Sequence, residues 1–233
     1  MKKNLFSIIL MAAFVFANTL TVFAENHESY ELNPLTYDEI ASSLSQATKV
    51  EEQSVTLDGE EMLIERFVSD KPAEIQPYTS SGIENREQTV LIGVTPRDSG
   101  VKDNSDWFYN SAVWAQVKIS YNVSTDSRGN EAYRLVSVKC EYRIDKSGYS
   151  VWNKYLQVTH RGVGIDGGPI VDKTSNITVT GTSYTYTSCS SWPAIVKAGP
   201  TYLSGARFNF RVGTSSGYQD CEINLRIIGN IEF

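Results

Sequence analysis

Histidine and cysteine are scarce in this chain, which has two histidines and three cysteines among 233 residues. His27 lies in the N-terminal segment, so a Ser–His–Asp system would depend on His160, and the sequence has no nucleophile-elbow motif. We interpret His160 as a strand-end histidine that reaches water and expect no catalytic residue. A thiol–imidazole pair of Cys189 and His160 is the weaker alternative, because it requires only proximity in space.

Cys-x-x-Cys pairs, EF-hand spacing and strongly basic stretches are also missing from the sequence. Their absence removes the usual indications of zinc, thiol redox chemistry, EF-hand calcium and nucleic acid. We therefore expect no cofactor and no nucleic-acid partner. Oxygen-bearing side chains crowd the segment Asp98–Asp106, where they could bind calcium, but the same residue types commonly form turns.

The chain has only one long apolar run, from Leu5 to Val22, which follows Lys2 and Lys3. This order, with a small residue at its end, is typical of a secretory signal peptide cleaved between Ala24 and Glu25. We expect a secreted, extracellular protein without stable membrane insertion after cleavage. A retained N-terminal membrane anchor is the alternative.

Acidic charge is unevenly distributed along the remaining chain. Residues 25–80 contain 13 acidic and three basic residues, whereas residues 81–233 contain 14 acidic and 16 basic residues. A composition break of this kind is typical of a module boundary. It predicts an acidic N-terminal arm or pro-region over residues 25–80 and one domain over residues 81–233.

The acidic arm carries signals for a short helix and a hairpin. Thr36 and Glu39 have the spacing of a capping box, with Leu35 and Ile40 placed as a hydrophobic staple. Further along, Asp58-Gly59 lies between apolar residues and favours a two-residue hairpin turn. Residues 70–82 contain two prolines and a polar end, which predicts a linker. The apolar stripe of the helix consists of Tyr37, Ile40, Leu44 and Ala47.

After residue 80 the sequence pattern changes to one typical of strands separated by turns. Alternating apolar residues predict half-buried strands and no helix. The expected fold class is an all-β, antiparallel, immunoglobulin-like β-sandwich of about seven strands, with a closed barrel as the main alternative. The expected strands are Thr89–Thr95, Asn110–Ser124, Ala132–Ile144, Tyr149–His160, Asn176–Thr187, 206–212 and 221–227. Residues expected on inner faces include Val136, Val138, Cys140, Tyr142, Ile144, Trp152, Leu156 and Val158.

The three cysteines allow one disulfide in an oxidising compartment. Cys140 and Cys221 both alternate in phase with inner-face residues, whereas Cys189 lies in a Ser-rich turn. We expect a Cys140–Cys221 disulfide and a free Cys189. A Cys189–Cys221 bridge is the nearest alternative.

Aromatic residues give the only indication of a binding surface. Trp114 lies on the outer phase of its strand, and Tyr133 and Leu135 lie on the expected matching face of the next strand. An outward apolar patch of this kind often marks a binding site, and flat aromatic rings suit stacking on sugars. Alternatively, the arm helix or a second sheet covers the patch, and a covering arm would expose it when the linker is cut.

These observations predict a secreted, non-enzymatic β-sandwich protein that binds a protein partner or a surface glycan. The first alternative is a secreted toxin or bacteriocin-like protein with a removable pro-region. An extracellular hydrolase is the second alternative, and it would require His160 or a carboxylate pair in a deep pocket.

Overall fold

The computed structural model describes residues 35–57, 59–72, 82–96 and 111–230, except for the side chains of residues 70–72. Within these ranges the chain is almost entirely β. Its elements are α2 (Tyr37–Leu44), β1 (Thr48–Leu57), β2 (Glu60–Pro72), β3 (Glu84–Pro96), β4 (Val113–Thr125), β5 (Glu131–Ile144), β6 (Ser150–Gly164), η1 (Ile165–Gly167), β7 (Ile170–Thr178), β8 (Ser183–Tyr186), η2 (Ser188–Ser191), β9 (Ile195–Val196), β10 (Leu203–Gly213) and β11 (Tyr218–Gly229).

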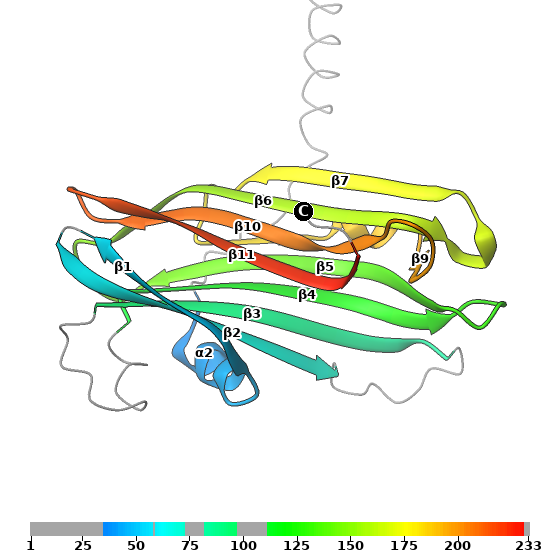
Figure 1. Ribbon diagram of the computed structural model, residues 1–233, viewed down its shortest axis with the longest axis horizontal. Coiled ribbons are helices and arrows are strands. Elements are labelled where there is room, and N and C mark those ends of the chain that lie inside the picture. Colours follow the sequence, from blue (N-terminus) through cyan, green and yellow to red (C-terminus); the bar gives the residue numbers. More distant parts are fainter. Residues whose placement is uncertain (1–34, 58, 73–81, 97–110, 231–233) are drawn as a thin grey trace, which may run out of the picture.

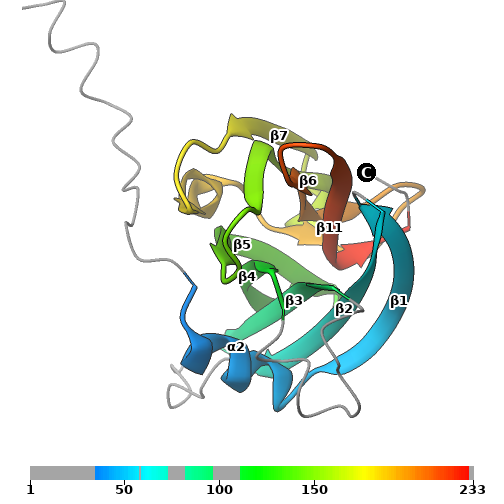
Figure 2. The ribbon, with the colours of Figure 1, turned by 90° about the vertical axis from the view of Figure 1, so that its left-hand side faces the viewer.

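The strands form one antiparallel sheet that curls until it nearly closes into a barrel. Its order is β1-β2-β3-β4-β5-β9-β6-β10-β11, with β7 paired to β6 and β8 paired to β5. Figure 1 shows β6, β7, β10 and β11 above β2–β5, and Figure 2 shows the strands wrapping around a common interior. The expected all-β antiparallel class is confirmed, but the structure has more than seven strands and joins them in a single sheet.

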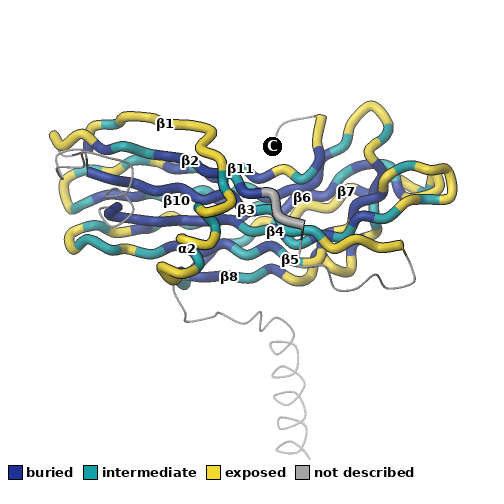
Figure 3. Tube along the Cα trace, turned by 90° about the horizontal axis from the view of Figure 1, so that it is seen from below, coloured by how far each residue is buried: buried dark blue, intermediate teal, exposed yellow. Residues whose placement is uncertain are grey.

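The interior of the curled sheet is the main hydrophobic core. Both layers supply side chains to it, from Val117 and Ile119 on β4 to Phe208 and Phe210 on β10. Figure 3 shows buried residues along the strands, whereas β1 and the turns are largely exposed. Burial on one face of each strand explains the alternating sequence pattern.

The predicted helix and hairpin of the acidic arm are both present. Thr36 and Glu39 form the capping box, in which each side chain accepts a hydrogen bond from the other residue's backbone N–H. The hairpin pairs Leu57 with Glu60, and β2 then pairs with β3 from Met62 to Pro72. Leu57 and Met62 lie in the main core, so strands from both sides of the expected boundary near residue 80 share one sheet and one core.

A β-bulge in β5 corrects the expected position of two patch residues. Ser120 pairs with Ser137 but Tyr121 pairs with Leu135, so Val136 is an additional residue on β5. An extra residue reverses which side chains face inward. Tyr133 and Leu135 therefore lie in the main core, whereas Val136, which we expected inside, is 36% exposed. Ile144 is also exposed rather than internal.

A second bulge, in β6, corrects the expected position of Trp152. Asn209 pairs with Tyr155 but Arg211 pairs with Trp152, which leaves one extra residue on β6 near Asn153. Asn153 has φ 50°, in the left-handed region that asparagine tolerates better than most residues. Leu156 faces the core as expected, but beyond the bulge Val151 takes the inner position and Trp152 faces outward.

The expected Cys140–Cys221 disulfide is not formed. All three cysteines are buried free thiols, and Cys140 and Cys221 both lie in the main core, as their phase predicted. Cys140 lies opposite Val117 and Tyr184 on its neighbouring strands, and Cys221 lies opposite Phe210. A disulfide requires Cα atoms within about 7 Å, and inward phase alone does not provide that proximity.

Two sequence expectations lie outside the described residues: the signal peptide with its cleavage site at Ala24–Glu25, and the oxygen-rich loop Asp98–Asp106. The expected linker lies there only in part, because β2 continues to Pro72. Within the ranges that the structure describes, no helix is long and apolar enough to cross a membrane.

Candidate ligand-binding surface

The expectation that His160 reaches water was wrong: it is fully buried between β6, β10 and the segment after η2. Its Nε2 lies 2.9 Å from the carbonyl oxygen of Pro193, and its Nδ1 lies 2.8 Å from Ser204 Oγ. A carbonyl only accepts, so Nε2 carries the proton and Nδ1 accepts from the serine hydroxyl. Burial lowers the pKa of His160 to about 4. The imidazole is therefore neutral near pH 7, and its hydrogen bonds join β6 to β10 and to the segment after η2.

The buried thiols also have environments that disfavour nucleophilic chemistry. Burial raises the pKa of Cys221 to about 12 and raises that of Cys140 further. Cys189 is fully buried, and its Sγ lies 3.6 Å from the carbonyl oxygen of Tyr186. Because the thiolate is the reactive form, neither Cys140 nor Cys221 is prepared for catalysis.

Trp114, the first residue of the expected patch, lies on the outside of the sheet but is completely covered. It packs in a small cluster with Leu35, Ile40, Phe67 and Leu91, and α2 lies over the strands at this point. Tyr133 instead lies in the main core, where its ring stacks on Tyr121. The structure therefore does not bring the three expected patch residues together on one exposed surface.

A different aromatic group lies on the outer face of β6, β10 and β11. We call it the Trp152 surface, consisting of Trp152, Arg211, Tyr218 and Asp220. The rings of Trp152 and Tyr218 meet edge to face with centroids 6.1 Å apart, and the guanidinium of Arg211 lies 4.3 Å above the Tyr218 ring. Tyr218 is 53% exposed, whereas Trp152 is only partly exposed.

Gly213 makes room for this arrangement at the end of β10. A Cβ at this position would meet the carbonyl oxygen of Gly217, and would lie 2.9 Å from Cη2 of Trp152. The indole ring therefore lies against backbone that only glycine leaves uncovered. The β6 bulge turns Trp152 outward and Gly213 accommodates the ring, so two separate sequence features position one partly exposed indole.

The charged members of the Trp152 surface form an ion pair. Arg211 Nε lies 2.6 Å from Asp220 Oδ1, and the hydrogen bond from this contact raises the pKa of Arg211. Asp220 is 67% exposed in its side chain, so the pair contributes little to stability. The surface thus presents apolar ring area beside fixed hydrogen-bond donors and acceptors.

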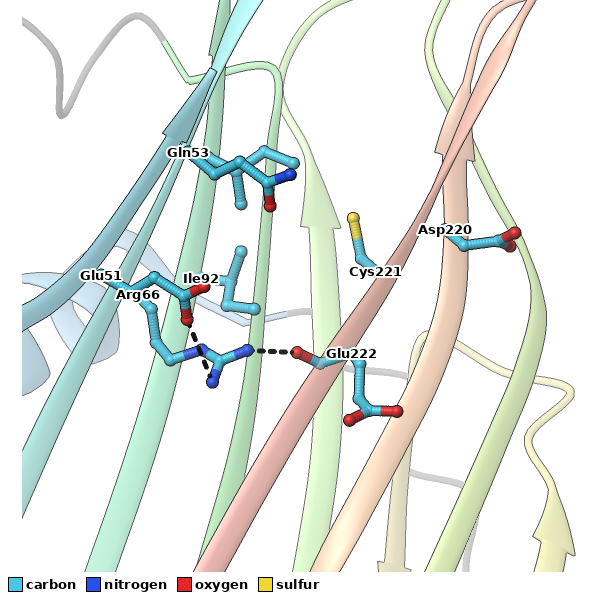
Figure 4. Close-up of a pocket in the computed structure, with 8 residues that line it drawn as sticks. Glu51, Gln53, Arg66, Ile92, Asp220, Cys221 and Glu222 are labelled. Carbon is cyan, nitrogen blue, oxygen red and sulfur yellow. Dashed lines mark hydrogen bonds and ion pairs between the residues drawn. The ribbon is translucent and has the colours of Figure 1, made fainter. Parts of the chain in front are cut away.

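A pocket of about 190 Å³ lies where the two ends of the sheet approach each other. Figure 4 shows Arg66 of β2 reaching across this gap, where it donates a 2.8 Å hydrogen bond to the carbonyl oxygen of Glu222 on β11. Its Nη1 also lies 3.3 Å from Glu51. Asp220 lines the same pocket, so this gap adjoins the Trp152 surface, although no aromatic residue lines it.

Metal binding has no support in the part of the chain that the structure describes. No group of three or more His, Cys, Asp or Glu side chains there is arranged to hold an ion. The Trp152 surface offers aromatic ring area beside side-chain hydrogen-bond donors and acceptors.

Sequence reasoning missed the Trp152 surface because it assigned Trp152 to the core. The usable signal was Asn153, a residue type that tolerates positive φ within a strand pattern. Comparison with known proteins adds no functional information: no protein-family model, no curated protein and no solved structure matches this chain.

Proposed function

We propose that this is a secreted, non-enzymatic protein that binds glycans through the Trp152 surface. The observation that carries the proposal is the outward placement of Trp152, beside the half-exposed ring of Tyr218. A core position for Trp152 would bury more of this large apolar ring. The bulge instead leaves part of that ring accessible, which a binding role explains.

Sugar rings match the mixed chemistry of this surface. Their C–H faces pack on indole and phenol rings, while their hydroxyl groups both donate and accept hydrogen bonds. Arg211 provides N–H donors and Asp220 provides carboxylate acceptors, held within 2.6 Å of each other. A neutral sugar can use both groups without leaving a buried, unpaired charge.

The proposed function includes no catalytic step, because the buried histidine and the buried thiols are not available for one. His160 is neutral, engaged at both ring nitrogens and 0% exposed. The pKa values of Cys140 and Cys221 are raised by burial. These groups support the core, and the exposed groups at the Trp152 surface support reversible binding.

The test is a glycan-binding assay with matched aromatic variants. The protein should be retained by at least one member of a panel of soluble and insoluble polysaccharides, and calorimetry should then give its affinity. Trp152→Ala and Tyr218→Ala should each weaken that affinity about tenfold or more, a change of about 1.4 kcal/mol or more.

Tyr37→Ala is the matched control, because Tyr37 is also an exposed tyrosine stacked on an arginine, with Arg143 at 3.9 Å. This variant should bind as tightly as the unmodified protein. Retention of full affinity by folded Trp152→Ala, or no binding to any polysaccharide in the panel, would overturn the proposal.

A further inference from the structure

In the described part of the chain the curled sheet has four free strand edges, on β1, β7, β8 and β11, of which β8 is only four residues long. Exposed edges offer unpaired N–H and C=O groups to other strands, and proteins usually block them with charge, bulges or side chains. β1 is blocked in this way. It carries Lys49, Glu51 and Glu52, and its register shifts between Lys49 and Glu51.

The edge of β11 is blocked by side chains. The backbone N–H of Thr214 donates to the carbonyl oxygen of Gly217 at the turn between β10 and β11, so these two residues form a hydrogen-bonded pair. Hydrogen-bonded and non-hydrogen-bonded pairs alternate along antiparallel strands, and Asp220 and Glu222 therefore direct their backbone groups away from β10. Gln219 Nε2 donates to the carbonyl oxygen of Asp220, and Arg66 donates to that of Glu222. The outward carbonyls of Asp220 and Glu222 are therefore both occupied.

The edge of β7 carries the charged residues Asp172 and Lys173, but among the described residues no side chain donates a hydrogen bond to its backbone and its pairing has no bulge. Two flanking bonds, from Gly164 N to Pro169 O and from Val179 N to Lys154 O, fix which pairs of β6 and β7 are hydrogen-bonded. The alternation leaves the backbone groups of five β7 residues pointing away from β6. They are Ile170, Asp172, Thr174, Asn176 and Thr178.

The position of β7 leaves this edge accessible to another strand. β7 pairs only with β6, and Figure 1 shows it as the outermost strand of its layer. Its register with β6 contains no bulge. Ile170, at its start, is 77% exposed, so the edge also carries apolar surface that a second strand would cover.

We propose that β7 pairs with β7 of a second copy of this chain, antiparallel and with the two-fold axis at Thr174. Thr174 is the central residue of the strand and directs its N–H and C=O outward, so this register aligns all nine residues. Such an isologous pairing closes a dimer. The charged edge of β1, the occupied carbonyls of β11 and the shortness of β8 then disfavour further addition of strands.

The side chains along β7 are compatible with a second copy as the occupant. In this register Asp172 lies opposite the partner's Asn176, and Lys173 lies opposite the partner's Ser175. Val171 meets the partner's Ile177. No like charges face each other, and Asp172 already pairs with Arg161 of its own chain at 2.9 Å. A register centred one residue earlier would place the two Lys173 side chains opposite each other.

A cysteine at the proposed axis tests this register. In the dimer, the two Thr174 residues form a hydrogen-bonded antiparallel pair with Cα atoms about 5.5 Å apart, within disulfide range. Thr174→Cys should therefore form an intermolecular disulfide under mild oxidation. Asp172→Cys, which lies opposite the partner's Asn176, should form markedly less.

Light scattering and sedimentation provide the second test. The unmodified protein should be a dimer at high concentration, and Thr174→Val should remain one. Thr174→Pro removes only an outward N–H and should give a folded monomer, and Thr174→Lys should do so by placing two charges at the axis. A wild-type protein that stays monomeric at millimolar concentration, or a Thr174→Cys variant that fails to cross-link, would overturn the proposal.

Discussion

Trp114 and Trp152 lie in similar places but have different surroundings. Each is on the outer face of the sheet, with its ring against a glycine on the adjacent strand. A Cβ on Gly93 would lie 2.8 Å from Cζ3 of Trp114, as one on Gly213 would lie 2.9 Å from Trp152. Trp114 is 0% exposed beneath α2, whereas Trp152 is partly open beside Tyr218.

The difference shows that the local strand structure does not decide whether an outward ring becomes core or binding surface. Over Trp114, Ile40 of the amphipathic helix α2 and Leu35, which precedes the helix N-cap, complete a hydrophobic cluster. Near Trp152 the neighbouring groups are the charged pair Arg211 and Asp220. We therefore expect Trp114 to contribute to stability and Trp152 to contribute to binding.

The largest expected change in the free energy of unfolding is that caused by Trp114→Ala. Removing a fully buried aromatic side chain typically lowers the free energy of unfolding by about 3–5 kcal/mol. Urea unfolding followed by circular dichroism measures this change. A loss below about 1 kcal/mol would show that the cluster under α2 does not function as core.

Acid should weaken the fold through His160, which is buried in the core. Unfolded histidine titrates near 6.5 and folded His160 near 4, so the unfolded chain binds the extra proton in between. The contribution is complete above pH 6.5 and falls by about 3 kcal/mol as the pH drops to 4. Urea unfolding at a series of pH values measures this slope, and His160→Gln should flatten it. An equal slope in that variant would assign the acid sensitivity to other groups.

Loosening the cover over Trp114 should have a smaller effect. Ile40 is fully buried against the strands, in a helix of only eight residues. Ile40→Ala should cost about 2 kcal/mol, near the lower end for buried aliphatic truncations. It should also make indole fluorescence more accessible to acrylamide. Unchanged quenching would mean that α2 is held in place by other contacts.

The smallest effect on stability is expected for Trp152→Ala. Trp152 already contacts solvent, so its removal should change the free energy of unfolding by less than about 1 kcal/mol, in contrast to Trp114→Ala. The same urea experiment provides the comparison. A loss similar to that of Trp114→Ala would make Trp152 a structural residue.

Local signals in the sequence predicted local structure well. Thr36 and Glu39 specified the helix start, and Asp58-Gly59 specified the hairpin, because neighbouring residues determine both. Sheet closure was not predictable in this way. It depends on contacts such as Arg66 with Glu222, which are 156 positions apart.

The candidate site was less predictable, because two bulges change which residues face outward. Alternation along β5 placed Tyr133 outside, yet the extra residue Val136 brings it into the core. Alternation along β6 placed Trp152 inside, yet the bulge at Asn153 turns it outward. A period of two cannot show an inserted residue, and only the residue type of Asn153 gave a local indication.

Fluorine NMR of protein labelled with 5-fluorotryptophan tests the central comparison most directly. Single Trp→Phe variants assign the resonances, and the protein is titrated with the polysaccharide that retains it best. The account predicts that the Trp152 resonance shifts or broadens with ligand while the Trp114 resonance stays unchanged. A ligand-dependent shift of Trp114 with no change at Trp152 would contradict the account.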